Sequence, residues 1–74
     1  MKIAIFGTGG VGGYFGGRLA QSGQDVTFLA RGKHLNAIRE NGLQIESADG
    51  NFTIYPAKAT DSTESIGAVD LILL

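Results

Sequence analysis

The sequence predicts an α/β fold with a parallel sheet, and three observations support that prediction. Residues 2–6 form a short apolar run rich in strand formers, and residues 25–30 form a second run of the same kind. Between them, a glycine cluster leads into a helical pattern over residues 11–22. A strand, a helix and a strand within the first 30 residues form the βαβ unit, whose two strands lie parallel.

Composition limits the classes of protein to which the chain can belong. Of its 74 residues, 43% are hydrophobic and 18% are charged, and the net charge is -1. This balance excludes a disordered segment and provides no basic surface for nucleic acid. Cysteine is absent, which excludes disulfides and thiolate metal sites and favours the cytoplasm. The first apolar run ends at Gly7, too early for a signal peptide, and no run approaches the ~20 apolar residues of a membrane span. We therefore expect no nucleic acid, membrane or metal partner.

The first strand and helix differ in their pattern. The unbroken apolar run of residues 2–6 is typical of a strand that is buried on both faces. The helix of residues 11–22 has one apolar stripe and one adjacent stripe of very small side chains, and Gly23 is a suitable stop. The apolar stripe contains Val11, Phe15 and Leu19, and the small stripe contains Gly12, Gly16 and Ala20. Glycine within a helix costs roughly 1 kcal/mol relative to alanine, so we expect Gly16 and Gly17 to serve close packing of the helix on the sheet.

Residues 7–12 match the pattern G-x-G-x-x-G between a strand and a helix, which is the context of the dinucleotide-binding fingerprint. Gly7 permits the tight turn out of the strand, Gly9 lets the backbone approach a pyrophosphate, and Gly12 lets the helix pack closely on the strand. Free N–H groups at the start of the helix then face the anion. A P-loop is excluded because no lysine occurs between Lys2 and Lys33. The predicted pyrophosphate site consists of Gly7, Thr8, Gly9, Gly10, Val11 and Gly12.

The end of the second strand indicates which dinucleotide is preferred. An NAD site has an acidic residue there for the ribose hydroxyls, but Asp25 and Glu40 are both misplaced for that role. Arg31 and Lys33 instead offer two cations to a 2′-phosphate, which predicts NADPH as the cofactor. The alternative is that both are solvated loop charges. His34 is expected to be a surface residue at the start of a helix.

The remaining elements complete one half of a larger domain. We expect a short helix over residues 33–41 that buries Leu35 and Ile38, and a helical turn capped by Asp61 or Ser62. Alternating runs predict a β-hairpin, and two further runs predict a short parallel strand and a buried one. The hairpin strands cover residues 43–46 and 52–55, and the two further strands cover residues 57–60 and 68–74.

A doubly wound dinucleotide-binding fold normally has about six strands in two halves, and only the first half is accounted for here. The prediction is therefore a Rossmann-like N-terminal fragment of such a domain, with a β-hairpin insertion, over residues 1–74. We expect its free sheet edge and apolar last strand to allow self-association.

Several segments together resemble the ketopantoate reductase family, also called 2-dehydropantoate 2-reductases. These segments are residues 2–12, the stretch Ala30-Arg31-Gly32-Lys33-His34-Leu35, residues 42–45 and residues 70–74. The resemblance implies reduction of 2-dehydropantoate to (R)-pantoate with NADPH in pantothenate biosynthesis, by an N-terminal Rossmann domain followed by a helical domain. It also implies cofactor contacts at residues 7–12 and at Arg31.

The family's catalytic lysine, its substrate-binding asparagine and serine, and a partner glutamate all lie beyond position 74 by this resemblance. No catalytic residue is therefore assigned within the chain, and the helical domain that binds the 2-ketoacid substrate is expected to lie outside it. Three alternatives remain open. They are a reductase of a related 2-ketoacid, a nucleotide-sensing domain without catalysis, and a fragment that folds incompletely and binds nothing.

Overall fold

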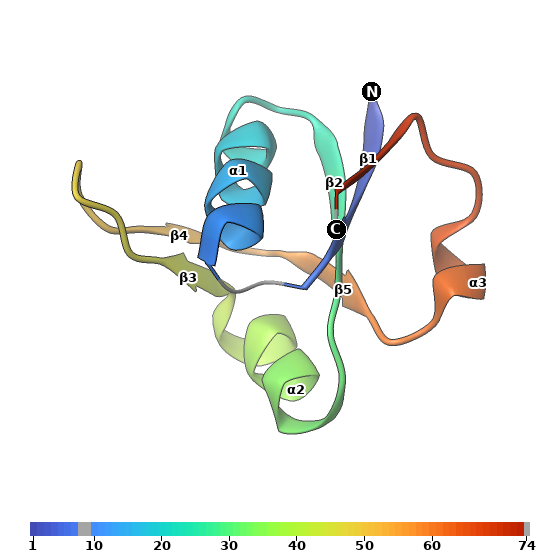
Figure 1. The fold of residues 1–74 in the computed structure, drawn as a ribbon. Helices are drawn as coiled ribbons and strands as arrows, with labels where there is room; N and C mark the ends of the chain where they lie inside the picture. The colour runs from blue at the N-terminus through green and yellow to red at the C-terminus, as the bar shows by residue number, and fades with distance from the viewer. Residues whose placement is uncertain (8–9, 74) are drawn as a thin grey trace.

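Four parallel strands form the main sheet of the protein, and a separate antiparallel hairpin packs beside it (Figure 1). The structure, a computed structural model, describes residues 1–7 and 10–73, with the backbone alone for residues 10–12. In chain order, the elements are β1 (Lys2–Phe6), α1 (Gly10–Gln21), β2 (Asp25–Leu29), α2 (Gly32–Asn41), β3 (Leu43–Ile45), β4 (Phe52–Ile54), β5 (Lys58–Thr60), α3 (Thr63–Ile66) and β6 (Leu71–Leu73).

The strand order is β5-β2-β1-β6, and each neighbouring pair is parallel. β2 and then β5 therefore follow β1 on one side, and β6 lies on the other side of β1. This order is the first half of the doubly wound dinucleotide-binding fold, which confirms the predicted Rossmann-like fold. α1 and the hairpin lie on one side of the sheet, and α3 lies on the other (Figure 1).

β1 occupies the centre of the sheet because it can bury apolar side chains on both faces. Ile3, Ala4 and Ile5 are almost completely inaccessible to solvent, as the unbroken apolar run predicts. Phe28 of β2 and Ile38 of α2 belong to the same apolar cluster as Ile3 and Ile5. Gly16 of α1 also approaches Ile5 and Phe28, so α1 and α2 cover the same face of the sheet.

Gly16 of α1, rather than the aromatic side chain of Phe15, faces the sheet. A Cβ on Gly16 would lie 2.8 Å from Ile5 Cγ1 and 2.8 Å from Phe28 Cε1, so the helix approaches too closely for any side chain there. Phe15, from the predicted apolar stripe, is instead 54% exposed. The close packing on the sheet that we expected for the small stripe is therefore confirmed at Gly16.

α2 and the hairpin follow the prediction closely. α2 starts one residue earlier than expected, at Gly32, and buries Leu35 and Ile38. Gly42 ends it with a φ of +83°, and its N–H donates to the Ile38 carbonyl at 2.8 Å. In the hairpin, β3 pairs antiparallel with β4.

The last two parallel strands are confirmed, but two details of this region are not. β6 was expected to be buried, yet Leu71 and Ile72 are 41% and 51% exposed. β6 is the outer strand of the sheet, and no described element covers that edge. Ser62 occupies the N-cap position of α3, but no side-chain hydrogen bond caps this short helix.

Candidate functional site

The candidate site begins where the chain leaves β1. Gly7 follows β1 with a φ of +95°, which side chains disfavour, and a Cβ at this position would meet nothing within 4 Å. Glycine is therefore required here by backbone conformation rather than by crowding. α1 begins at Gly10, and the chain turns from strand to helix within three residues. This geometry agrees with the predicted turn.

The remaining residues of the predicted pyrophosphate site are only partly described. Thr8 and Gly9 lie outside the described residues. Gly10, Val11 and Gly12 belong to the first turn of α1, and their side-chain environment also lies outside the description. Their contacts with a cofactor stay a prediction.

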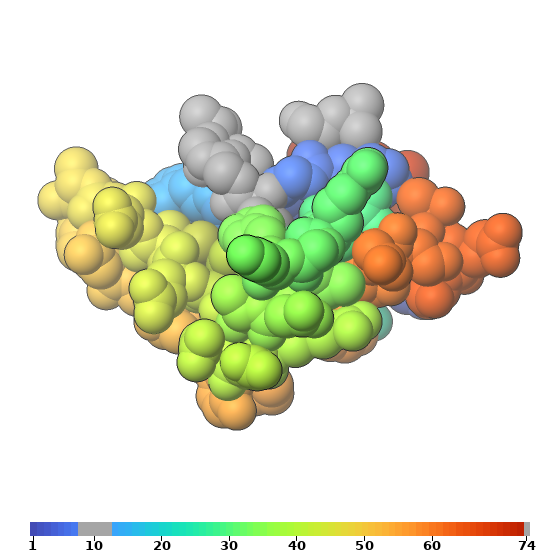
Figure 2. All heavy atoms as spheres, turned by 90° about the horizontal axis from the view of Figure 1, so that it is seen from below, coloured from blue at the N-terminus to red at the C-terminus, as the bar shows by residue number. Residues whose placement is uncertain are grey.

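Strand register brings the second predicted region close to the first. Phe6 pairs with Leu29, so Gly7 and Ala30 are the first residues beyond the paired segments of two adjacent strands. Neighbouring strands lie about 4.8 Å apart. Ala30 N–H also donates to the Thr60 carbonyl of β5 at 3.0 Å, so three strands end side by side. Figure 2 looks at the molecule from this carboxyl end, with α2 at its centre between the hairpin and the segment that follows β5.

Arg31 and Lys33 lie at this edge with exposed side chains. Arg31 has extended backbone angles, φ −144° and ψ 163°, and immediately precedes α2. Lys33 lies in the first turn of α2. Within residues 1–7 and 10–73, neither side chain has a hydrogen bond or an ion pair. His34 is exposed at the helix start, as predicted. Because both cations are free of protein partners in this part of the chain, they are available to an anionic ligand.

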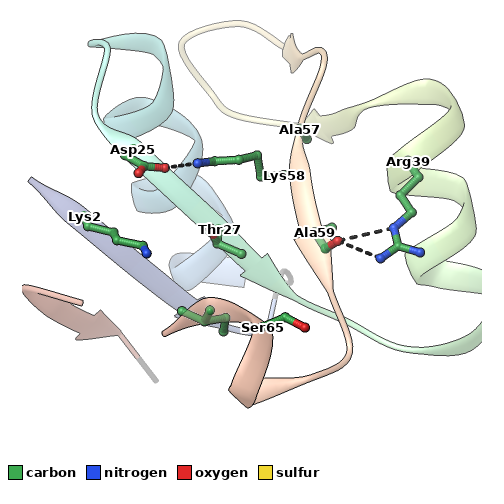
Figure 3. Close-up of a pocket in the computed structure, with 9 residues that line it drawn as sticks. Lys2, Asp25, Thr27, Arg39, Ala57, Lys58, Ala59 and Ser65 are labelled. Atoms are coloured by element: carbon green, nitrogen blue, oxygen red, sulfur yellow. Dashed lines mark hydrogen bonds and ion pairs between the residues drawn. The ribbon is translucent and has the colours of Figure 1, made fainter. Parts of the chain in front are cut away.

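A cavity of about 430 Å³ lies at the other end of the sheet, where the strands begin (Figure 3). Three of its charged side chains are paired with one another or with the backbone. Lys58 of β5 forms an ion pair with Asp25 of β2, and Arg39 of α2 donates from Nε and Nη2 to the Ala59 carbonyl at 3.3 and 3.1 Å. The lining residues are Lys2, Asp25, Thr27, Arg39, Ala57, Lys58, Ala59, Ser65 and Ile66.

The electrostatics of this cavity serve the sheet rather than a ligand. The hydrogen bond from Lys58 lowers the pKa of the Asp25 carboxyl below its usual value. Nearby, the Lys2 N–H donates to the Asp70 carboxylate at 2.8 Å, which ties the start of β1 to the residue before β6. Ligands of open α/β sheets bind at the carboxyl ends of the strands, so this cavity is not the candidate site. The sequence pattern did not predict it, although the charged residues at strand starts were visible.

The described residues contain neither a candidate metal cluster nor a helix that could span a membrane. In residues 1–7 and 10–73, no group of three or more histidine or acidic residues is arranged to hold a metal ion. No helix in this same part of the chain has the length and apolar character needed to cross a membrane.

Comparison with known proteins identifies the family. The family model described as "Ketopantoate reductase PanE/ApbA" matches residues 3–74. The chain belongs to the ketopantoate reductase family. This family consists of oxidoreductases that use a nicotinamide cofactor, which agrees with the strand order and the glycine-rich turn.

Individual relatives match this chain over nearly its whole length. A 2-dehydropantoate 2-reductase of Mesorhizobium japonicum is 44% identical over 75 residues, which span 100% of this chain and 23% of the relative. The "Uncharacterized oxidoreductase YkpB" of Bacillus subtilis is 42% identical over 74 residues, which span 100% of this chain and 24% of the relative. The crystal structure of 2-dehydropantoate 2-reductase from Geobacter metallireducens GS-15 superposes with a TM-score of 0.88 at 43% identity. That match covers 97% of this chain and 24% of the other, so the chain spans about a quarter of these proteins.

Proposed function

We propose that residues 1–74 form the NADPH-binding part of a 2-dehydropantoate 2-reductase. Family membership and the names of two relatives, both 2-dehydropantoate 2-reductases, support this proposal. Because the chain spans about a quarter of those relatives, we assign the substrate-binding helical domain and the catalytic residues to polypeptide outside it. The chain's own task is then to bind and orient the cofactor, which supplies the hydride that reduces the ketone of a 2-ketoacid.

The turn between β1 and α1 supports binding of the pyrophosphate. Gly7 has the positive φ that this turn needs, and its Cα is free of neighbours on the side where a Cβ would lie. The first N–H groups of α1 have no partners within the helix, and the helix dipole favours an anion in front of them. In this proposal, Gly9 and Gly12 allow close approach of the backbone and of the helix, respectively.

A single observation carries the preference for NADPH. Arg31 lies directly after the β2 segment that pairs with the exit of β1, and its guanidinium has no partner in the described part of the chain. A guanidinium binds phosphate through two parallel hydrogen bonds and can also stack on adenine. Lys33, in the first turn of α2, adds a second positive charge. No acidic residue occupies residues 29–34, where an NAD site would need one for its ribose.

A reductase of a different 2-ketoacid is the second candidate. The 42% identical relative from Bacillus subtilis is named only as an oxidoreductase, so membership in this family does not fix the substrate. Both candidates share the cofactor site and differ in the polypeptide that contacts the substrate.

Calorimetric titration of the complete protein with NADPH and with NADH tests the cofactor assignment. We expect NADPH to bind at least about 10-fold more tightly, and Arg31→Ala to remove most of that difference, because hydrogen bonds to charged groups contribute about 1.5–3 kcal/mol. Arg39→Ala is the matched control, since it removes an exposed arginine whose hydrogen bonds go to the Ala59 carbonyl of β5. Equal affinity for both cofactors that Arg31→Ala leaves unchanged would overturn the assignment.

Turnover separates the two candidate reactions. The complete protein is mixed with NADPH and either 2-dehydropantoate or other branched 2-ketoacids, and the loss of NADPH absorbance is followed. Preferred turnover of 2-dehydropantoate supports the first candidate. Turnover of another 2-ketoacid alone supports the second, and no turnover with any 2-ketoacid would contradict both.

A further inference from the structure

α1 is held from two sides at adjacent glycines. Gly16 faces the sheet, whereas Gly17 faces the hairpin. A Cβ on Gly17 would lie 2.9 Å from Ile45 Cγ1 of β3 and 3.1 Å from Phe52 Cε2 of β4. The hairpin therefore touches the helix backbone as closely as the sheet does.

Arg18 joins the helix to the hairpin on the surface. Its guanidinium carbon lies 4.5 Å from the centre of the Phe52 ring and 5.3 Å from the centre of the Tyr14 ring. Nε donates to the Tyr14 hydroxyl at 3.3 Å, and Nη1 donates to Gln21 Oε1 at 3.0 Å. The Tyr14 and Phe52 rings lie 6.5 Å apart in an edge-on arrangement. We call the contact of Arg18, Tyr14 and Phe52 the hairpin clamp.

The composition of α1 explains why such a contact matters for its first turn. Five of its twelve residues are glycine, at positions 10, 12, 13, 16 and 17. At roughly 1 kcal/mol each relative to alanine, these glycines make the isolated helix weak. Packing on neighbouring elements must therefore determine where the helix lies. Tyr14 is one turn beyond Gly10, so the hairpin clamp acts on the segment next to the first turn.

We propose that the hairpin clamp makes Arg18 and Phe52 positioning residues for the dinucleotide's pyrophosphate. This inference rests on the proposed function, because it takes the N–H groups at the start of α1 as the pyrophosphate's partners. The clamp fixes the axis of α1, and the axis fixes where those N–H groups point. Arg18 lies on the exposed surface of α1 and Phe52 lies in β4, and in this proposal neither touches the cofactor.

The test compares three ligands in the complete protein carrying Arg18→Met or Phe52→Leu. Both changes keep a flexible apolar side chain and remove the cation–ring contact. We expect the Kd values of NADPH and NADH to rise by the same factor, about 3- to 10-fold, because both changes remove the contact between the Arg18 guanidinium and the Phe52 ring. The Kd of adenosine 2′-monophosphate, which has no pyrophosphate, should not change. The double variant should equal the single ones, since both remove one contact.

Each other outcome has a defined meaning. A loss of affinity for all three ligands would show that the hairpin clamp serves general stability, and it would overturn the inference. Unchanged affinity for both dinucleotides would overturn it as well, while leaving the proposed function intact. A wild-type protein that binds neither dinucleotide would overturn the proposed function and this inference together. Arg39→Met makes the same chemical change at an arginine whose bonds go to β5, and it should alter none of the three Kd values.

Discussion

The two ends of the parallel sheet differ in how their charges are partnered. At the amino end, Lys58 pairs with Asp25, and the Lys2 N–H donates to the Asp70 carboxylate. At the carboxyl end, Arg31 and Lys33 have no such partner within the described residues. Charges that hold strands together are thus concentrated at one end, and charges available to a ligand at the other. The cavity lies at the first end, so a hollow alone does not mark the functional site.

The direction of the strands is the physical reason for this difference. All four strands run the same way, so the helix that follows β1 starts at the carboxyl end of the sheet. Helix starts carry partial positive charge and free N–H groups, which favour anions. Cations near that edge add to this attraction when they are left unpaired. At the amino end, an unpaired charge would give no such benefit, and pairing stabilises the sheet.

The largest effect that tests this contrast is expected from Arg31→Asp. The carboxylate repels a 2′-phosphate but can accept hydrogen bonds from ribose hydroxyls, as in NAD sites. We expect NADPH affinity to fall about 100-fold and NADH affinity to hold or rise, from the 1.5–3 kcal/mol typical of charged hydrogen bonds. The free energy of unfolding should change by less than about 0.5 kcal/mol, because the side chain is exposed.

Titration with both dinucleotides and a thermal melt of the same variant provide the measurements. A variant that kept wild-type affinity for NADPH would show that Arg31, at the carboxyl end of the sheet, does not bind the 2′-phosphate. A large loss of stability would show that Arg31 belongs, like Arg39, to the charges that hold the fold.

The regular elements near the site were predictable from sequence because each has a local pattern. The apolar run of β1, the glycine-rich turn at Gly7 and the strand that ends before Arg31 were all recognised, and so was the parallel pairing of the first two strands, whereas the order of all four strands was not predicted. Position 42 likewise has a glycine where α2 must stop.

The details that were missed depend on contacts between distant residues. The exposure of Phe15 could not be read from its stripe, because it depends on how closely Gly16 approaches Ile5. The exposure of Ile72 depends on which strand becomes the sheet edge. The double hydrogen bond from Arg39 to β5 joins residues 20 positions apart. The cofactor contacts of the predicted site residues, including Thr8 and Gly9, stay a prediction.

A smaller effect is expected from Arg39→Ala at the free edge of β5. The backbone groups of alternate residues of β5 point toward β2, as the Thr60 carbonyl does when it accepts from Ala30 N–H. The carbonyl of Ala59, the residue before, therefore points to the free edge of the sheet, where Arg39 covers it. Loss of this contact should lower the free energy of unfolding by about 1 kcal/mol and leave cofactor affinity unchanged. It should also raise self-association, because an uncovered strand edge can pair with another chain.

Chemical denaturation measures the first effect of Arg39→Ala, and sedimentation over a range of protein concentrations measures the last. Arg18→Ala is the matched control for self-association alone, as it removes an arginine that contacts the hairpin and not the strand edge. If Arg39→Ala weakened NADPH binding at full folding, the separation between the two ends of the sheet would fail.

The smallest effect is expected from Lys58→Met, and it should appear only through pH. Because the hydrogen bond from Lys58 lowers the pKa of Asp25 in the folded protein, Asp25 binds a proton less readily there than in the unfolded chain. The pair therefore stabilises the fold above the unfolded value of 3.8, and this contribution is lost as the pH falls through the lower folded value. Lys58→Met should lower the Tm slightly at neutral pH, and the difference from wild type should shrink below pH 3.8. Added salt should shrink it too, since both side chains are largely exposed. A difference that persisted in acid would mean that the aliphatic stem of Lys58, rather than its charge, links β5 to β2, whereas NADPH affinity at neutral pH should remain that of wild type in either case.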